Sequence, residues 1–400
     1  MRGDSQRPVD ITLNAVPDGN ELELAWRSLE DRASGSFFSS WSWVGCWLAS
    51  LKSSAKTLLL KATREGKVVG LAIFVAASTK RFRLVPVRSL ALHATGDPAF
   101  DTLTVEHNDF LVAAENAAEI RSYMFQHLID SGVAWDQLLL PGLSQTARQV
   151  MKGCPGVSLR ERLNLCYLVD LKPLAERGNE YLTQLTSNTR QQIRRSMKAY
   201  REIGPVVLSE AVDKETAQAF LNRLKSLHQS HWVAKGKSGA FDSAYFVEFH
   251  RSLIDNCFAR GEIQLLRVSA GDVDIGYLYN FVHRGRVLFY QSGFDYQLVE
   301  KHGRPGLVAH ALAVDHNSRL GHHTYDLLAG SVRYKQSLAS HSELLSWVVL
   351  HRETQAFRLE EFLRRCKRSF LGHPAAEASA SRFNEASPEI SSVEGRQPRA

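Results

Sequence analysis

The chain has 400 residues, of which 44% are apolar, and a formal net charge of +7. This length suits two domains, because a single hydrophobic core rarely grows past about 250 to 300 residues. The longest apolar run, Val68–Ala77, is about half as long as a membrane-spanning helix, and the five cysteines include no CxxC pair. We therefore expect a cytoplasmic protein without a disulfide framework or zinc knot, whose charge favours a polyanionic ligand without identifying it.

Helices and strands alternate in the first half of the sequence. Trp43 and Trp47 are one helical turn apart within Ser36–Ser50, and a serine can cap this predicted helix. We further predict a β-hairpin over 57–77 that turns at Glu65-Gly66, a helix over 114–132 and a strand over 135–143. Residues 1–19 are expected to be a flexible N-terminus.

The second half begins with a predicted strand over 166–174, and we place the domain boundary after residue 170. Helices are predicted over 217–231 and 245–260, then strands over 263–270, 274–282 and 287–295, a helix over 305–321, and strands over 323–330 and 342–352. The halves, residues 20–170 and 171–371, share an α+β order at a coarse level. Residues 372–400 are poor in aromatics and predict a disordered tail.

The helix predicted from Pro305 begins in a way that suits phosphate binding. Proline fits the first helical position, because its missing N–H would have no partner there, and the flanking glycines Gly303 and Gly306 allow close approach of a ligand. Unpaired N–H groups and the positive end of the helix dipole favour an anion. An ordinary helix start with solvated charges is the alternative.

A basic helix is predicted over Ser187–Arg201. Thr189 and Gln192 form a capping-box pattern, and Ile193, Met197 and Tyr200 form the apolar stripe. The cations outside this stripe are Arg190, Arg194, Arg195, Lys198 and Arg201. They form either an anion-binding surface or a solvated face. Nucleic acid is the least favoured ligand, because no aromatic stacking platform accompanies the cations.

Several segments in order resemble the GNAT-like acetyltransferases associated with cellulose and exopolysaccharide biosynthesis, the CelD/BcsL group. These segments are SNTRQQIRRSMKAY, LHQSHWVAKGKSGAF, YQSGFD, RPGLVAH, YDLLAG and RYKQSLA. The resemblance implies tandem GNAT-like domains related to the Fem-type transferases, each a mixed twisted sheet flanked by helices. It also implies acetyl-CoA or another acyl-CoA as the donor. One departure is that GRPG is poorer in glycine than the usual GNAT phosphate loop.

The resemblance also assigns roles to residues. Catalytic roles fall to Asp326, His228, Tyr334 and Lys335, cofactor contacts to Ser292, Gly293, Lys301, Arg304, Gly306 and Leu307, and substrate contacts to Arg190, Arg194, Trp232 and Tyr290. Each has a plainer alternative: a buried ion pair for Asp326, core packing for His228, and a solvated loop for Tyr334 and Lys335. His228 and His231 have metal-ligand spacing, but no third ligand is near in sequence, so we predict no metal.

The function indicated is direct acyl transfer from acyl-CoA to an amine or hydroxyl of a sugar or polysaccharide-related acceptor. No GxSxG, Walker, HExxH or GxGxxG motif is present, which argues against hydrolase, NTPase, zincin and dinucleotide-binding functions. Two alternatives stay open: a Fem-like transferase that uses aminoacyl-tRNA, and a non-catalytic binding subunit of a polysaccharide assembly. A peripheral contact with a membrane or with polysaccharide machinery is a further expectation, whereas nucleic acid is disfavoured as a partner.

Overall fold

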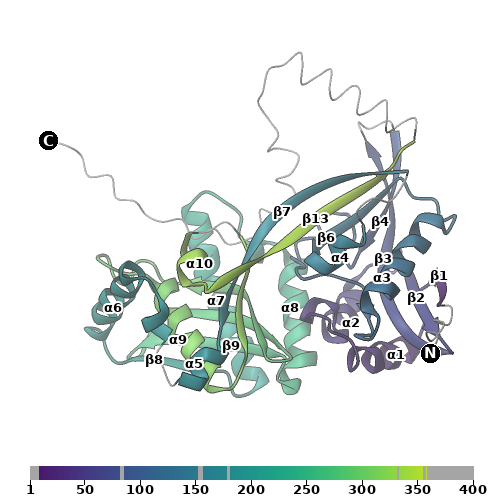
Figure 1. The fold of residues 1–400 in the computed structure, drawn as a ribbon. Coiled ribbons are helices and arrows are strands. Elements are labelled where there is room, and N and C mark those ends of the chain that lie inside the picture. The colour runs from purple at the N-terminus through teal and green to yellow at the C-terminus, as the bar shows by residue number, and fades with distance from the viewer. Residues whose placement is uncertain are drawn as a thin grey trace, which may run out of the picture. The chain divides into compact units, whose positions relative to one another are not determined.

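A computed structural model describes residues 9–354 and 357, apart from 82–84, 152–155, 178–180 and 331–332. The described residues up to Leu163 and from Leu344 onward form one compact unit, and Asn164–Glu343 form a second. Strands β7 (Val157–Asp170) and β13 (His341–Arg352) contribute to both units (Figure 1). The predicted tail, residues 372–400, lies outside the described residues.

The first unit is a mixed sheet with helices. Its elements are β1 (Asp10–Ala15), α1 (Glu21–Glu30), α2 (Trp41–Ser50), β2 (Lys56–Arg64), β3 (Lys67–Arg81), β4 (Val85–Leu92), β5 (Leu111–Val112), α3 (Ala117–Asp130), β6 (Gln137–Leu143) and α4 (Gln145–Gln149). The strand order is β1-β2-β3-β4-β6-β13, and β5 pairs with β3. The pairing is antiparallel except between β4 and β6.

Local sequence explains the main elements of this unit. Glu65 and Gly66 have φ values of 54° and 74°, the left-handed conformation that a two-residue hairpin turn requires, so the predicted turn between β2 and β3 is confirmed. The Ser40 side chain caps α2 by accepting the Trp43 N–H. Gly70 of β3 lets α3 pack closely, because a Cβ there would lie 2.3 Å from the sulfur of Met124.

Two boundaries differ from the prediction. Residues 10–15, expected to belong to a flexible N-terminus, form β1 and pair with β2 from Asp10↔Thr63 to Ala15↔Leu58. The strand predicted as the last of the second half belongs from Leu344 onward to the first unit, because β13 pairs with β6 from Ser346↔Leu143 onward. Both differences arise from pairing between distant strands, which the local apolar pattern does not specify.

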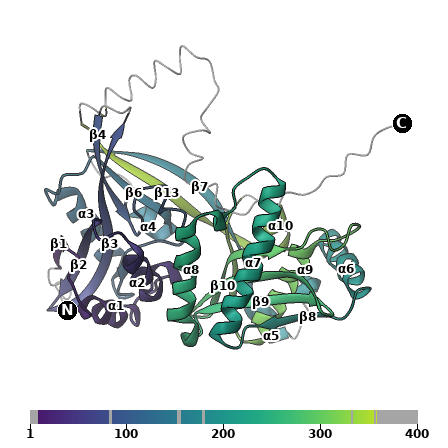
Figure 2. The same cartoon turned by 180° about the vertical axis from the view of Figure 1, so that it is seen from behind.

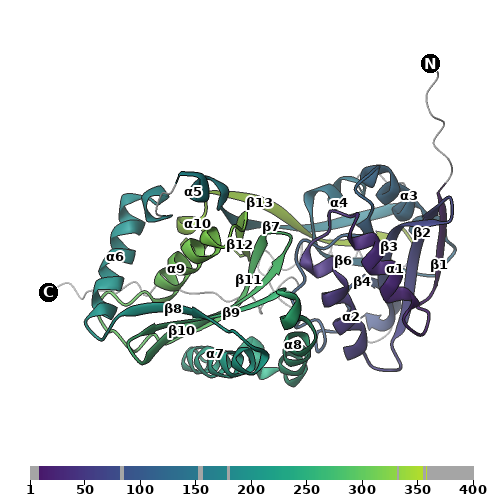
Figure 3. The ribbon, with the colours of Figure 1, turned by 90° about the horizontal axis from the view of Figure 1, so that it is seen from below.

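The second unit is also a mixed sheet, with strand order β7-β12-β11-β10-β9-β8. Its elements are α5 (Lys172–Arg177), α6 (Ser187–Arg201), β8 (Val206–Glu210), α7 (Lys214–Ala234), α8 (Ala244–Cys257), β9 (Ile263–Ala270), β10 (Val273–His283), β11 (Arg286–Phe294), α9 (Pro305–Arg319), β12 (Thr324–Ala329) and α10 (Arg333–Leu338). Helix α7 lies across β9 and β10 (Figure 2). Helices α6 and α9 lie on the opposite face of the sheet (Figure 3).

Helix α9 is central to the core of this unit. It is buried on nearly every side, including Gly306, Ala309 and Ala313, whose small size allows close packing. It packs with apolar strand residues such as Leu278 and Phe289. Pro305 occupies the start of the helix, as predicted. Among the described residues, no helix combines the length and the apolar character needed to cross a membrane.

Candidate active site

The candidate site begins at a gap between two parallel strands of the second unit. Strands β11 and β12 pair at three positions, from Arg286↔Thr324 to Leu288↔Asp326. β11 then continues to Phe294 with β10 as its partner, whereas the pairing of β12 with β7 shifts after Asp326. Leu328 has a φ of 59°, a strained conformation for a branched residue. Within the described chain, residues 289–294 therefore have no strand partner on the β12 side.

An ion pair between the partly exposed Arg286 and the buried Asp326 holds the two strands at the point where they separate. Asp326 is fully buried and accepts hydrogen bonds from Arg286 Nε at 2.9 Å and from the Leu328 N–H at 2.8 Å. The Cys166 thiol also lies 3.0 Å from its Oδ1. Burial alone would lower the pKa of Arg286, but the charges of Asp326 and Glu343 raise it above its usual value. These contacts from β7, β11 and β12 fix the carboxylate in place, and the geometry favours a positioning role for Asp326.

His228 on α7 presents an unpartnered nitrogen close to the gap. Its Nδ1 lies 3.0 Å from the Ser292 carbonyl oxygen, and because a carbonyl only accepts, Nδ1 must carry the proton. Nε2 is then a buried acceptor with no partner among the described residues. Burial lowers the pKa of His228 to about 4, so the ring is neutral at pH 7. Trp232 and Phe241 pack against it at centroid distances of 6.0 and 5.1 Å.

Two residues predicted to contact the cofactor, Ser292 and Gly293, also contact α7. A Cβ on Gly293 would lie 2.2 Å from the backbone oxygen of Leu224, so the glycine accommodates the helix. The Ser292 carbonyl binds His228. Tyr290, predicted to contact substrate, is the extra residue of a β-bulge and is buried against Phe246, His250 and Phe281. Packing accounts for these three positions.

The start of α9 suits an anion. The side chain of its N-cap residue, Arg304, makes no capping hydrogen bond, while its backbone N–H donates to Ser196 Oγ of α6 at 2.9 Å. Lys301 and Arg304 are exposed beside the first turn, to which Gly306 and Leu307 belong. A first turn without a side-chain cap leaves backbone N–H groups for a ligand, and the adjacent cations add favourable charge. These four predicted residues are thus brought together.

Tyr334 and Lys335 lie on α10, and neither is part of a solvated loop. The Tyr334 hydroxyl is buried without a partner among the described residues, and burial raises the pKa of Tyr334 well above its usual value. Its ring stacks on His310 at 5.6 Å. Lys335 is buried and donates from Nζ to the Ala329 carbonyl at 2.7 Å, which holds the end of β12.

Helix α6 directs its cations away from the core. Its buried positions are Thr189, Ile193, Ser196 and Tyr200, and no ion pair to its five cations occurs within the described part of the chain. A shallow hollow on the outer side is lined by Ser187, Asn188, Arg190, Gln191, Arg194, Arg195 and Lys198. Because α6 and α7 lie on opposite faces of the sheet, Arg190 and Arg194 are not grouped with His228 (Figure 3). The helix cap is Thr186, not the predicted Thr189, which is buried one turn later.

Sequence reasoning missed three residues at this site, of which Cys166 and His310 are buried and Arg286 is partly exposed. Arg286, the partner of Asp326, lies just before the strand predicted over 287–295, and Cys166 begins the strand predicted over 166–174, so neither position suggested a role in the site. His310 lies inside α9, with Nδ1 3.1 Å from the Tyr325 hydroxyl, and burial lowers its pKa to about 3. The available signal was a polar residue within the otherwise apolar stretch GLVAHALAV.

Comparisons with known proteins identify the domain. Residues 187–336 match the acetyltransferase (GNAT) domain model. The fold is similar to a crystal structure of FemX, with 10% identity, a TM-score of 0.56, and coverage of 87% of this chain and 99% of that chain. L-PGS from Bacillus licheniformis was also found, at 8% identity, 87% and 96% coverage, and a TM-score of 0.48. So was a tandem GNAT protein from the clavulanic acid biosynthesis pathway, at 9% identity, 85% and 98% coverage, and a TM-score of 0.43.

The search of curated proteins found no match. The finer resemblance to the CelD/BcsL group stays a prediction, whereas the predicted GNAT fold, a mixed sheet with flanking helices, is confirmed. Residues 187–336 of the chain are therefore an acetyltransferase (GNAT) domain.

Proposed function

We propose that the second unit transfers an acetyl or other acyl group from acyl-CoA directly to an amine or hydroxyl of a sugar or polysaccharide-related acceptor. One observation carries this proposal: the gap between β11 and β12 lies next to a helix whose first turn has no side-chain cap. The gap offers unpaired backbone groups to the extended, amide-bearing arm of coenzyme A, and the helix start offers N–H groups to the phosphates of coenzyme A.

The donor is held in this proposal by backbone groups more than by side chains. The first-turn N–H groups of Gly306 and Leu307 bind the pyrophosphate, and Lys301 and Arg304 add positive charge. Residues 289–294 of β11 line the gap in which the thioester lies. Asp326 and Lys335 act as positioning residues, because they hold β12 in its diverging course.

The proposed chemistry uses one base and one acid. Nε2 of His228 takes a proton from the acceptor, and the acceptor nitrogen or oxygen forms a bond to the acyl carbon. The carbon–sulfur bond breaks, and the departing thiolate takes the proton of the Tyr334 hydroxyl. Burial keeps His228 unprotonated and Tyr334 protonated at pH 7, which are the states in which a base and an acid begin the reaction.

Calorimetric titration with acetyl-CoA tests the donor. We expect the wild type to bind and the Arg304→Glu/Gly306→Asp variant to bind at least about 100-fold more weakly, because two new carboxylates would repel the pyrophosphate. Arg319→Glu, which makes the charge change of Arg304→Glu at the other end of α9, is the control and should bind within about threefold of wild type. Absence of wild-type binding at millimolar acetyl-CoA would contradict the proposal.

The outward cations of α6 support a second candidate, a Fem-like transferase that uses aminoacyl-tRNA. Under the acyl-CoA proposal, ribonuclease treatment leaves the activity unchanged, and Arg194→Glu/Lys198→Glu changes the KM for acetyl-CoA less than about threefold. Loss of activity after ribonuclease treatment would favour the tRNA donor. Function retained after Asp326→Ala, Tyr334→Phe and Lys335→Ala would instead favour a non-catalytic subunit of a polysaccharide assembly.

A further inference from the structure

In the first unit, as at the candidate active site, two parallel strands pair over a short stretch and then separate. Strands β4 and β6 pair in parallel at three positions, from Ser89↔Gln137 to Ala91↔Leu139. β4 ends at Leu92, while β6 continues to Leu143. Strands β11 and β12 of the second unit also pair at three positions before they separate. Each unit thus has one place where a parallel pair opens.

The opening in the first unit is filled by the chain itself. Asn108 forms a parallel bridge with Leu143, its N–H donates to the Gly142 carbonyl at 2.9 Å, and its carbonyl accepts the Ser144 N–H at 3.3 Å. Four residues later the same segment forms β5, which pairs with Gly70 and Leu71 of β3 beyond the end of β4. Residues 105–112 therefore take the place in the sheet that β4 leaves between β3 and β6.

The side chain of Asn108 joins the two parted strands. Its Nδ2 donates to the Leu92 carbonyl at 3.3 Å and to the Pro141 carbonyl at 3.0 Å. Its Oδ1 lies 2.8 Å from Nδ1 of His93, and the whole residue is buried. A single carboxamide thus satisfies backbone groups on both sides of the opening, which would otherwise need a ligand or water.

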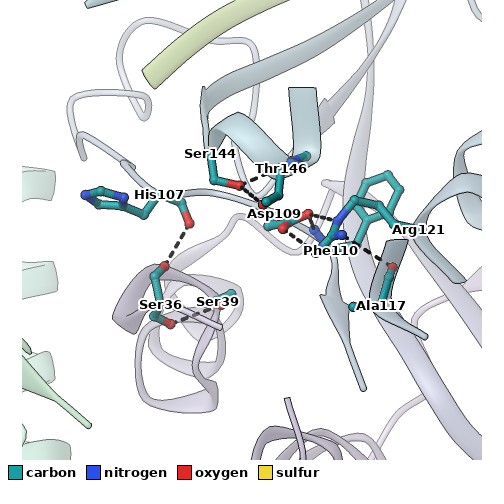
Figure 4. Close-up of polar contacts among 10 residues, drawn as sticks. Ser36, Ser39, His107, Asp109, Phe110, Ala117, Arg121, Ser144 and Thr146 are labelled. Atoms are coloured by element: carbon teal, nitrogen blue, oxygen red, sulfur yellow. Dashed lines mark hydrogen bonds and ion pairs between the residues drawn. The ribbon is translucent and has the colours of Figure 1, made fainter. Parts of the chain in front are cut away.

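The flanking residues anchor the segment on both sides (Figure 4). Asp109 accepts hydrogen bonds from Arg121 at 2.8 and 2.7 Å, and Ser36 Oγ donates to the His107 carbonyl at 2.9 Å. His107 has a φ of 48°, a conformation that persists only where the surroundings impose it. Gly142 is equally constrained, since a Cβ there would lie 2.2 Å from the Val105 oxygen.

We propose that residues 105–112 are a built-in occupant of the opening between β4 and β6 in the first unit. This opening therefore admits no acyl-CoA, and each chain binds one donor molecule, in the second unit. The location of that donor rests on the function proposed above. Among the described residues at this opening, the carbonyls of Leu92 at the end of β4 and of Pro141 on β6 are already bound by Asn108.

Hydrogen–deuterium exchange of the full chain, with and without saturating acetyl-CoA, tests this. We expect acetyl-CoA to slow exchange at least about tenfold in peptides covering 289–294 and 306–308. We expect residues 105–112 to exchange slowly already, at a rate that the coenzyme leaves unchanged. Added protection of 105–112 or 137–143 would overturn the proposal. If acetyl-CoA protects neither unit, the proposed function fails. The exchange rate of residues 105–112 without coenzyme still tests the built-in occupant: slow exchange supports it and fast exchange contradicts it.

A variant pair gives an independent measurement. Asn108→Ala should lower the Tm by roughly 4 to 10 °C, since it leaves two buried carbonyls without a donor. The exposed Asn14→Ala in β1 should change the Tm by less than about 2 °C. If Asn108→Ala fails to fold, Asn108→Asp replaces it, because the carboxylate keeps the size of the amide but removes both donated hydrogen bonds. Unchanged thermal stability of either variant would show that the segment does not close the opening.

Discussion

Replacing His228 by glutamine is expected to lower kcat by about 10²- to 10⁴-fold, the usual contribution of a general base. The variant removes the basic Nε2 but keeps a side chain that can donate to the Ser292 carbonyl. Release of free thiol from acetyl-CoA, measured with glucosamine and short cello-oligosaccharides as acceptors, gives kcat. Circular dichroism checks that the variant is folded.

His231→Gln is the matched control for this substitution. His231 lies one turn later on α7, stacks on Tyr296 at 4.3 Å, and also has a pKa lowered to about 4 by burial. It should cost less than about tenfold in kcat. A base with a pKa near 4 is fully deprotonated above pH 6, so kcat/KM should stay flat between pH 6 and 8 and fall only as the pH approaches 4. A decline centred near pH 6.5 would identify another group as the base.

Asp326→Ala is expected to destabilise the protein by about 3 kcal/mol, because it removes the buried partner of Arg286, leaving Glu343 as a partly exposed one, and unpairs the Leu328 N–H. Urea unfolding measures the change. The double variant Arg286→Met/Asp326→Leu removes both charges and should recover most of the lost stability, since an apolar pair has no desolvation penalty to offset.

Asp326→Asn separates this role from catalysis. If Asp326 only positions β12, the asparagine variant should keep kcat within about tenfold at temperatures where it is folded. A loss of more than about 100-fold in a folded Asp326→Asn enzyme would restore Asp326 as the general base. A cost below about 1 kcal/mol for Asp326→Ala would contradict the positioning role.

Much of the second unit could be predicted from local sequence. The runs over 263–270, 274–282 and 287–295 are apolar and separated by glycine-containing turns, and Pro305 marks the start of a helix. The short edge strands β1 and β8 were missed. Their residues are partly exposed, and only their pairing with β2 and β9 identifies them as strands. The place of β13 was assigned to the wrong unit for the same reason.

The sequence could name candidate site residues but not their contacts. His228 was named through the resemblance of LHQSHWVAKGKSGAF, yet its tautomer depends on a carbonyl 64 residues away. Asp326 was found through YDLLAG, but its partner Arg286 lies 40 residues earlier, in a stretch with the composition of a turn. Such pairings are set by how the strands are ordered in the sheet, which periodicity does not encode.

The close contact between Gly293 and the Leu224 carbonyl has a consequence for how this enzyme can vary. Leu224 lies one helical turn before His228 on α7. The distance between the imidazole of His228 and β11 therefore depends on the direct backbone contact between Leu224 and Gly293. Any side chain at position 293 would push α7 away from β11 and lengthen the hydrogen bond from His228 Nδ1 to the Ser292 carbonyl. Under the proposed function, a residue without a reactive group thus controls the position of the base, and substitutions at position 293 should be tolerated far less than on the outer surface of α6.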